Sequence, residues 1–290
     1  MTTSSARGLE GLPSLKEVIA SFGLAARRSL GQHFLLDPRI TERIAAAAGK
    51  LEGRTVIEVG PGPGGLTRAL LAAGAAPLIA IERDDRCVAA LQSLNAAAQG
   101  RLAIVPADAL TVDEAELARA NGGATPLTIV ANLPYNIATV LILKWLARAG
   151  DFADIVVMVQ KEVAERLAAS PRSSDYGRLS VMVQWRAQVE MLFDLAPGAF
   201  TPPPKVVSTV VRITPRAEPL APAEFKAMET VVRAAFGQRR KMLRSALKTL
   251  GRNTGQLLDA AGITPTARAE ELSIAEFASL ARAYAAGGEA

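Results

Sequence analysis

The stretch Thr-Val-Ile-Glu-Val-Gly-Pro-Gly-Pro-Gly-Gly-Leu-Thr, residues 55–67, decides the fold of this chain. It begins with mostly β-branched residues, which predict a short buried strand. Gly60, Gly62 and Gly65 then allow a tight turn whose backbone amides can approach a ligand closely. Residues 66–73 are predicted to form a helix, whose first N–H groups are unpaired and carry the positive end of the helix dipole. A strand, a glycine-rich turn and a helix in this order predict a nucleotide-binding site.

Two acidic residues bear on which nucleotide is bound. Glu58 lies inside the strand, directly ahead of the glycines, and Glu82 ends the next apolar run, residues 77–81. An acid at the end of a second strand can hold both hydroxyls of an adenosine ribose. These features resemble the first motif and the second-strand acid of the class I methyltransferases, which bind S-adenosylmethionine. The glycine spacing alone also fits an NAD-type Rossmann loop, so an NAD-dependent oxidoreductase stays as an alternative.

Length, composition and charge exclude several classes of protein. The 290 residues, half of them hydrophobic, suffice for one large domain or for a large and a small one. No apolar run approaches the ~18 residues of a membrane span, and residues 1–12 lack the pattern of a secretory signal, so we expect a cytoplasmic protein. One cysteine, Cys87, and one histidine, His33, predict neither a disulfide framework nor a metal site. The net charge of +5 and the pI of about 9.6 fit a polyanionic partner, although they fit simple solubility as well.

Strand and helix patterns alternate between residues 55 and 159. After the glycine turn, strands are predicted at 78–81, 102–105, 127–131 and 155–159, and helices at 86–98, 114–119 and 139–148. This alternation predicts an α/β fold with a Rossmann-like, mostly parallel sheet covered by helices. Ligands bind beyond the carboxyl ends of such strands. Gly60, Glu82, Asp108 and Asn132 all follow strand ends, so we expect them to converge on one site.

The pattern changes beyond residue 179. Residues 179–185 and 206–213 are predicted strands, and residues 187–191 form a possible short one. Because no long helix fits between them, we expect antiparallel pairing at one end of the sheet. That arrangement suits a methyltransferase, whose last strand runs against the others. A linker at 215–222 precedes residues that are predicted to be helical throughout.

These patterns divide the chain into two expected domains. Residues 1–215 are predicted to form the methyltransferase domain, in which residues 1–25 are an N-terminal extension and helix. Residues 216–290 are predicted to form a small C-terminal domain made only of helices.

The tetrapeptide Asn132-Leu133-Pro134-Tyr135 resembles the Asn/Asp-Pro-Pro-Tyr signature of methyltransferases that act on exocyclic amines. An adenine amino nitrogen is a weak nucleophile because its lone pair is delocalised into the ring. The Asn132 side-chain oxygen and the Leu133 backbone oxygen can accept its two N–H groups and favour the reactive pyramidal form. Pro134 fixes the turn, and Tyr135 offers a face on which an extruded base can stack. Phe200, in a proline-rich loop, is expected to cover the other face, with simple packing as its alternative.

Further segments carry a resemblance to one family. They are Leu-Gly-Gln-His-Phe-Leu at 30–35, Gln-Lys-Glu-Val at 160–163, Tyr-Gly-Arg-Leu-Ser at 176–180, Phe-Thr-Pro-Pro-Pro-Lys-Val at 200–206 and Gln-Arg-Arg-Lys at 238–241. With the glycine motif and the tetrapeptide, they make about residues 26–250 similar to the ribosomal RNA adenine dimethyltransferases. The similarity is greatest to those that dimethylate two adjacent adenosines near the 3′ end of small-subunit rRNA. The resemblance implies these contacts with S-adenosylmethionine: His33, Leu35, Gly60, Gly62, Glu82 at the ribose, Asp108 at the adenine amino group, and Asn132.

Two positions depart from the family pattern. His33 stands where many members have asparagine, so a contact by its backbone, a contact by its ring nitrogen and a packing role all stay open. Val207 stands where the family usually has aspartate before Ser208. This second change concerns a local loop contact rather than the chemistry.

The resemblance also implies a surface that faces RNA. Residues 226–252 hold eight Lys or Arg residues against one acid, Glu229. The residues expected to contact RNA are Arg27, Arg28, Arg239, Arg240, Lys241 and Arg244. An ordinary solvated helix face is the alternative. The expected partner is small-subunit rRNA in an immature 30S subunit, with a role in small-subunit biogenesis, and the expected enzyme is a monomer that contacts no membrane and no metal.

Two other functions fit the same fold. One is a large-subunit rRNA adenine methylase of the antibiotic-resistance type, and the segments 200–206 and 238–241 favour the small-subunit type over it. The other is a non-catalytic ribosome-assembly factor. The intact tetrapeptide and Glu82 argue against a protein without catalytic activity, although both roles can coexist.

Overall fold

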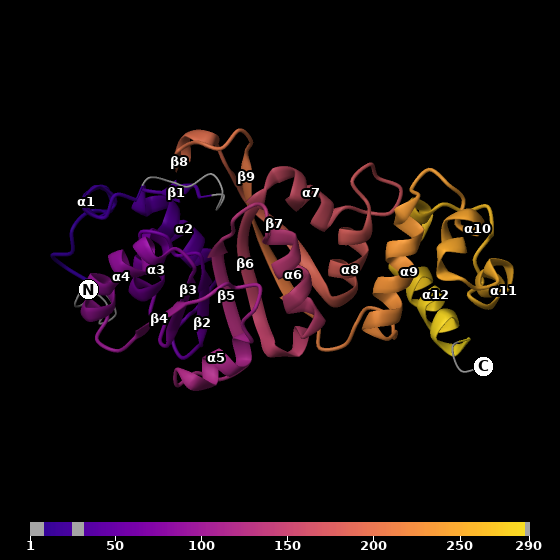
Figure 1. Cartoon of the computed structure of the whole chain (residues 1–290), viewed down its shortest axis with the longest axis horizontal. Helices are drawn as coiled ribbons and strands as arrows, with labels where there is room; N and C mark the ends of the chain where they lie inside the picture. The colour runs from indigo at the N-terminus through magenta and orange to yellow at the C-terminus, as the bar shows by residue number, and fades with distance from the viewer. Residues whose placement is uncertain (1–8, 25–31, 288–290) are drawn as a thin grey trace. The chain divides into compact units, whose positions relative to one another are not determined.

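A seven-stranded sheet is the central element of the computed structural model, which describes residues 9–24 and 32–287 (Figure 1). The strand order is β4-β3-β2-β5-β6-β9-β7. The strands are β2 (Val56–Val59), β3 (Leu78–Glu82), β4 (Leu102–Pro106), β5 (Leu127–Asn132), β6 (Phe152–Gln160), β7 (Ala187–Leu195) and β9 (Ser208–Pro215). The first five of these in sequence pair in parallel, whereas β9 runs antiparallel to β6, with Ile155 opposite Ile213. The predicted α/β fold with an antiparallel last strand is therefore confirmed.

The helices predicted at 66–73, 86–98, 114–119 and 139–148 form within a few residues of those bounds. The helices are α1 (Leu15–Ser21), α2 (Pro38–Ala47), α3 (Gly65–Ala72), α4 (Asp85–Ala97), α5 (Glu114–Ala120), α6 (Ala138–Ala147), α7 (Lys161–Ala168), α8 (Arg178–Arg186), α9 (Phe225–Gly237), α10 (Leu243–Ala246), α11 (Thr254–Ala260) and α12 (Ile274–Ala286). Ser14 and Glu17 form a capping box at the start of α1, and Asp37 accepts the Arg39 N–H at the start of α2. None of these helices combines the length and the apolar character needed to span a membrane, within the described residues.

The prediction of a strand at residues 179–185 is wrong, because this segment is helix α8. Five of its residues are buried: Ser180, Val181, Met182, Val183 and Trp185. A helix buried on most sides shows no amphipathic period, and its β-branched residues then resemble a strand. Its polar side chains bond backbone carbonyls at the end of α7: Ser180 donates to Arg166, and Gln184 donates to Leu167 and Ala169. The predicted hairpin of 179–185 with 206–213 is therefore wrong too; β9 lies between β6 and β7.

A second, two-stranded sheet was not predicted. β1 (Phe34–Leu35) pairs antiparallel with β8 (Phe200–Thr201), and Leu35 lies opposite Phe200. Residues 25–31, which precede this strand pair in the chain, lie outside the described residues. The pairing brings the proline-rich segment after Phe200 beside the segment that carries His33.

The chain divides into two compact units. One comprises Met1–Ala164 and Glu190–Thr214, and the other comprises Glu165–Val189 and Pro215–Ala290. The boundary predicted from the sequence lies at residue 215 and keeps residues 165–189 with the first domain, because residues 179–185 resemble a strand of the sheet. In the second unit α8 contacts α9 and α12. There Trp185 packs against Phe225 with 6.0 Å between ring centroids, and Phe236 stacks on Phe277 at 5.6 Å.

Candidate functional site

The predicted site residues meet in one hollow at the carboxyl ends of the parallel strands. It offers about 1100 Å³ of free space, its open mouth included. The residues from the sequence analysis that line it are His33, Leu35, Glu58, Gly60, Gly62, Glu82, Asp108, Asn132, Leu133, Pro134 and Tyr135. A parallel sheet brings such strand ends together at one edge. Phe200 is not one of the described residues that line this hollow.

The glycine turn is held from two sides. Gly62 has a φ of +55°, and a Cβ there would lie 3.1 Å from the Phe34 ring. A Cβ on Gly65 would lie 2.8 Å from the Leu35 carbonyl oxygen, which belongs to the backbone and cannot easily move. These glycines therefore allow β1 to pack directly on the turn. On the other side, the Gly62 N–H donates to Glu82 Oε2 at 3.0 Å.

Glu82 orders the end of β3 as well as the glycine turn. Its Oε1 accepts the backbone N–H groups of Arg83 and Asp84, both at 2.8 Å. Burial raises the pKa of Glu82, although its hydrogen bonds with the Asp84, Gly62 and Arg83 N–H groups oppose that shift. The carboxyl is thus a fixed acceptor at the edge of the hollow. A contact with a ribose stays a prediction.

Asp108 is fixed by its own loop and by a cation. Its Oδ1 accepts the Leu110 N–H at 3.0 Å, and its Oδ2 lies 3.1 Å from Arg83 Nη1. Arg83 also lines the hollow, although no feature of the sequence predicted it as a site residue. A contact between Asp108 and an adenine amino group stays a prediction. In that contact the amino group would donate to a carboxylate that Arg83 already pairs.

Glu58 carries a buried, unpaired oxygen at this edge of the sheet. Its side chain is 1% exposed, and its Oε2 has no hydrogen-bond partner. Burial raises the pKa of Glu58 to about 8; the nearby Thr67 hydroxyl opposes this shift, and the neighbouring Glu82 carboxyl adds to it. A buried carboxyl without a partner is costly for a fold. Because Glu58 also lines the hollow, a positive charge on a ligand there would favour the ionised form of this carboxyl.

The amide of Asn132 has a defined orientation. Its Nδ2 donates to the His33 backbone oxygen at 3.0 Å. A carbonyl can only accept, so this bond assigns the nitrogen and the oxygen of the amide. Within the described part of the chain, no donor reaches Asn132 Oδ1. The acceptor atom required by the sequence analysis is therefore free for a ligand at the hollow.

Aromatic rings follow Asn132 at the same rim. The Tyr135 ring stacks on the His33 ring, with 5.6 Å between centroids and 28° between planes. The Tyr135 hydroxyl is 2.6 Å from the Ser208 hydroxyl, and His33 Nδ1 donates to the Pro202 carbonyl at 2.8 Å. Phe200 is 3% exposed and meets His33 edge-on at 6.4 Å. The side chain of His33 thus supports the rim, and a stacking role for Phe200 stays a prediction.

The basic residues expected to contact RNA differ in their surroundings. Arg27 and Arg28 lie outside the described residues. Arg239 donates to Glu270 at 3.1 Å and to the Ser174 carbonyl at 2.6 Å, so its guanidinium ties parts of the second unit together. The three exposed residues Arg240, Lys241 and Arg244 have no acidic partner within the described part of the chain. These three are therefore better placed than Arg239 to meet a polyanion.

Comparisons with known proteins identify the family of this chain. The family model for "Ribosomal RNA adenine dimethylase" matches residues 23–286. A Ribosomal RNA small subunit methyltransferase A from Paramagnetospirillum magneticum is 61% identical over 272 residues, which is 94% of this chain and 95% of that protein. The protein of the same name from Rhodospirillum rubrum is 58% identical over 279 residues, or 96% and 95% of the two chains.

Solved structures give the same answer for the fold. A dimethyladenosine transferase from Plasmodium falciparum aligns with a TM-score of 0.72 at 27% identity, covering 86% of this chain and 96% of that one. The 23S rRNA methyltransferase ErmE aligns with a TM-score of 0.61 at 27% identity, covering 87% and 99%. The topology of the sheet and these comparisons show that the protein is a Rossmann-like methyltransferase and therefore an enzyme. Within that class, the chain belongs to the ribosomal RNA adenine dimethylase family.

Proposed function

We propose that the protein transfers methyl groups from S-adenosylmethionine to the N6 atoms of two adjacent adenosines near the 3′ end of small-subunit rRNA. The observation that carries this proposal is the Asn132 amide, whose nitrogen is held by the His33 carbonyl at 3.0 Å. This bond leaves the oxygen for an amino group at the rim of the hollow. The relatives named small subunit methyltransferase A support the choice of the small subunit.

The residues of the hollow fit S-adenosylmethionine as the methyl donor. This cofactor, when bound, supplies an electrophilic methyl group on a cationic sulfonium. Glu58 offers a buried carboxyl whose Oε2 has no partner, which suits a ligand that carries positive charge. We assign the ribose to Glu82 and the adenine amino group to Asp108, with backbone contacts at Gly60 and Gly62. Each of these groups lines the same hollow.

The chemistry of the chain's own residues is to orient and polarise the target amine. Asn132 Oδ1 and the Leu133 carbonyl accept its two N–H groups, which favours the pyramidal nitrogen with its lone pair free. The Tyr135 ring, held by Ser208 and His33, provides the surface against which the extruded base stacks. No strong base is required, since the methylated ammonium loses its proton readily.

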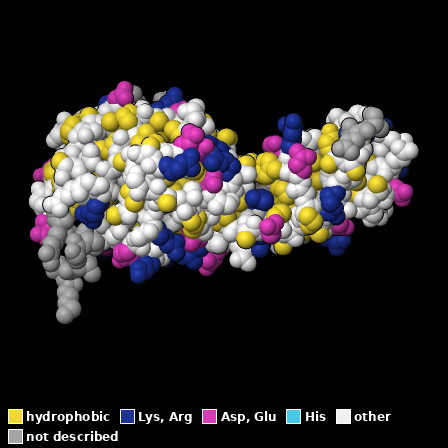
Figure 2. All heavy atoms as spheres, turned by 90° about the horizontal axis from the view of Figure 1, so that it is seen from below, with side chains coloured by type: hydrophobic (Ala, Val, Ile, Leu, Met, Phe, Trp, Pro, Cys, Tyr) yellow, Lys and Arg dark blue, Asp and Glu magenta, His cyan; other side chains and the backbone are white. Residues whose placement is uncertain are grey.

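Removing three exposed cations should test the RNA-facing surface. Figure 2 shows Lys and Arg side chains interspersed with Asp and Glu on the face that it draws, so we expect RNA contact to depend on particular residues. In the variant Arg240→Ala/Lys241→Ala/Arg244→Ala, the slope of log K against log salt should become shallower by about 2–3. Binding of an rRNA fragment is measured between low and moderate salt by fluorescence anisotropy.

The matched control for this variant is Arg239→Ala. Because Arg239 bonds Glu270 and Ser174, its loss should lower the Tm. The slope of log K against log salt should change by less than the amount expected for one phosphate contact. A wild-type slope in the triple variant would remove the assignment of these residues to RNA.

Small subunits that lack the methyl groups provide the direct test of the function. They are incubated with the enzyme and methyl-labelled S-adenosylmethionine, and the labelled nucleotides are mapped. We expect dimethylation of two adjacent adenosines near the 3′ end of the small-subunit rRNA. Label that enters only large-subunit rRNA would favour a resistance-type methylase, and tight subunit binding without label would favour a non-catalytic assembly factor. Either result would overturn the proposal.

A further inference from the structure

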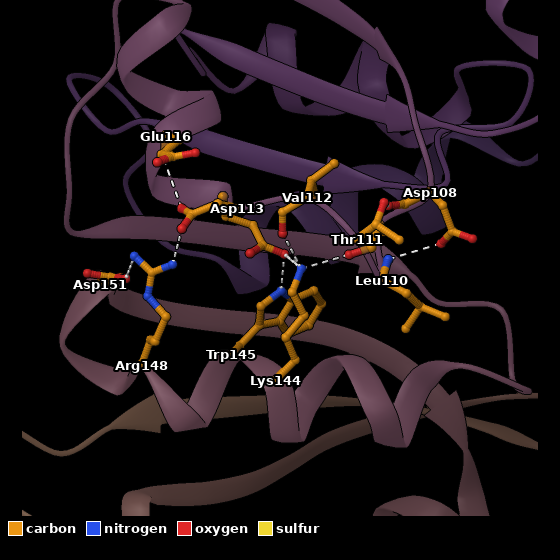
Figure 3. A network of polar contacts seen from close by, with 12 residues as sticks. Asp108, Leu110, Thr111, Val112, Asp113, Glu116, Lys144, Trp145, Arg148 and Asp151 are labelled. Atoms are coloured by element: carbon orange, nitrogen blue, oxygen red, sulfur yellow. Dashed lines mark hydrogen bonds and ion pairs between the residues drawn. The ribbon is translucent and has the colours of Figure 1, made fainter.

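The loop that carries Asp108 is held by helix α6, which begins beside the tetrapeptide of Asn132 (Figure 3). The loop joins β4 to α5. At the start of α6, the N–H groups of Ile137 and Ala138 donate to the Pro134 carbonyl. One helix therefore connects two parts of the hollow, the rim assigned to the methyl acceptor and the loop assigned to the adenine of the methyl donor.

Lys144 is the centre of this connection. Its Nζ donates to the Ala109 carbonyl at 2.8 Å, to the Val112 carbonyl at 2.6 Å and to Glu114 Oε1 at 2.8 Å. These three acceptors use all three donors of an ammonium group. The Lys144 side chain is 27% exposed and that of Glu114 only 5%. The contacts are therefore shielded from water. In such a shielded place, hydrogen bonds to a charged group are stronger than in water.

The position of the two carbonyls explains what Lys144 does to the loop. Ala109 directly follows Asp108, and Val112 lies three residues further on. Between them the loop closes on Asp108 itself, whose backbone oxygen accepts the Thr111 N–H at 2.9 Å and whose Oδ1 accepts the Leu110 N–H. Lys144 thus holds both ends of the turn that sets the direction of the Asp108 carboxylate.

Neighbouring residues of α6 support the same arrangement. Trp145 Nε1 donates to Glu114 Oε1 at 2.7 Å, which fixes the carboxylate that Lys144 needs. One turn further along, Arg148 pairs with Asp113 and Asp151, as Figure 3 shows. Arg148 is half exposed and contacts the start of α5 rather than the turn at Asp108. It provides a comparison residue at the C-terminal cap of the same helix.

We propose that Lys144 is a positioning residue for the methyl donor: by holding the Ala109 and Val112 carbonyls, it aims Asp108 at the adenine amino group. The proposal rests on the adenine role given to Asp108 under the proposed function. Lys144 does not touch the donor or the target base. It acts through the loop that carries Asp108. Its own place is fixed by α6, the helix that follows the tetrapeptide.

The test measures selectivity for the amino group. S-adenosylhomocysteine is compared with S-inosylhomocysteine, whose purine carries an oxygen in place of that amino group, by calorimetry with the intact protein. Lys144→Met removes the three donors. Because this change strands the buried Glu114 carboxylate, the second variant is Lys144→Met/Glu114→Gln, which keeps an acceptor for Trp145 and removes the unpaired charge. Arg148→Met is the matched control.

The wild type is expected to prefer the adenine compound about tenfold or more, since the inosine oxygen would face the Asp108 carboxylate. In both Lys144 variants this preference should fall about fivefold or more, and the KM for S-adenosylmethionine should rise about tenfold with little change in kcat. Arg148→Met should lower the Tm and keep the wild-type preference.

Two contrary results are distinguishable. If the Lys144 variants keep the wild-type preference, Lys144 is a structural residue and the proposal is wrong. If the wild type itself binds both compounds equally, the role of Asp108 is wrong and the proposal is overturned with it. The methylation assay on small subunits decides the proposed function independently of either result.

Discussion

Replacing Asn132 with alanine should leave cofactor binding within about threefold of wild type while methyl transfer falls by roughly 100- to 1000-fold. The reason is the division of labour within this amide. Its nitrogen bonds the His33 carbonyl, which is structural, whereas its oxygen is the acceptor proposed for the target amine. Losing that oxygen removes an interaction that strengthens as the nitrogen becomes pyramidal, so kcat should fall more than affinity.

Two measurements separate these effects. S-adenosylhomocysteine binding is followed by calorimetry, and methyl transfer is followed under single-turnover conditions with excess enzyme. The Tm of Asn132→Ala should fall slightly, since one hydrogen bond worth about 1 kcal/mol is lost. Asn95→Ala, on helix α4, is the control and should match wild type in all three measurements. A fully active Asn132→Ala enzyme would refute the amine-activation mechanism.

Much of this site could be predicted because the residues that form it sit at the ends of strands. A buried strand such as β2 is visible as a short apolar run, and parallel strands bring their ends to one edge whatever the helices do. Gly60, Glu82 and Asn132 therefore share one hollow, as the sequence analysis expected. The chemistry proposed for Asn132-Leu133-Pro134-Tyr135 also depends on local sequence, because the four residues are contiguous.

Features that depend on distant contacts were not predictable in the same way. Helix α8 is buried on most sides, so its sequence carries no helical period and resembles a strand. β1 and β8 are two residues long, and their pairing depends on segments far apart in the chain. Lys144 did leave a signal, since it is a lysine within the apolar run of α6, but nothing in the sequence places the Ala109 and Val112 carbonyls next to it.

Glu58→Gln should stabilise the ligand-free protein at high pH and change it little at low pH. Glu58 is buried and its pKa is raised to about 8, chiefly by burial. The folded protein therefore holds this proton between about pH 4.5 and pH 8, whereas the unfolded chain releases it. Where the folded state binds more protons, stability falls as the pH rises. The loss of unfolding free energy caused by Glu58 is thus small below pH 4.5 and reaches its full size above pH 8.

The size of this effect makes it measurable. The raised pKa of Glu58 corresponds to a loss of roughly 3–5 kcal/mol in the free energy of unfolding at pH 9. Glutamine keeps the shape of the side chain and carries no charge, so the Tm difference between Glu58→Gln and wild type should grow from pH 5 to pH 9. Glu42→Gln, an exposed substitution on α2, should show no such trend. A constant difference across this range would mean that the Glu58 carboxyl is not held neutral in the fold.

The same carboxyl should respond in the opposite sense when a cationic ligand binds. Positive charge near Glu58 favours its ionised form and lowers its pKa, so S-adenosylmethionine should cause the protein to release a proton near neutral pH. Calorimetry in buffers of different ionisation enthalpy measures that proton. Glu58→Gln should abolish its release and weaken the pH dependence of binding, while the exposed Glu42→Gln should release it as wild type does. Binding of S-adenosylmethionine without proton release in wild type would show that the unpaired Oε2 does not face the cationic part of the donor.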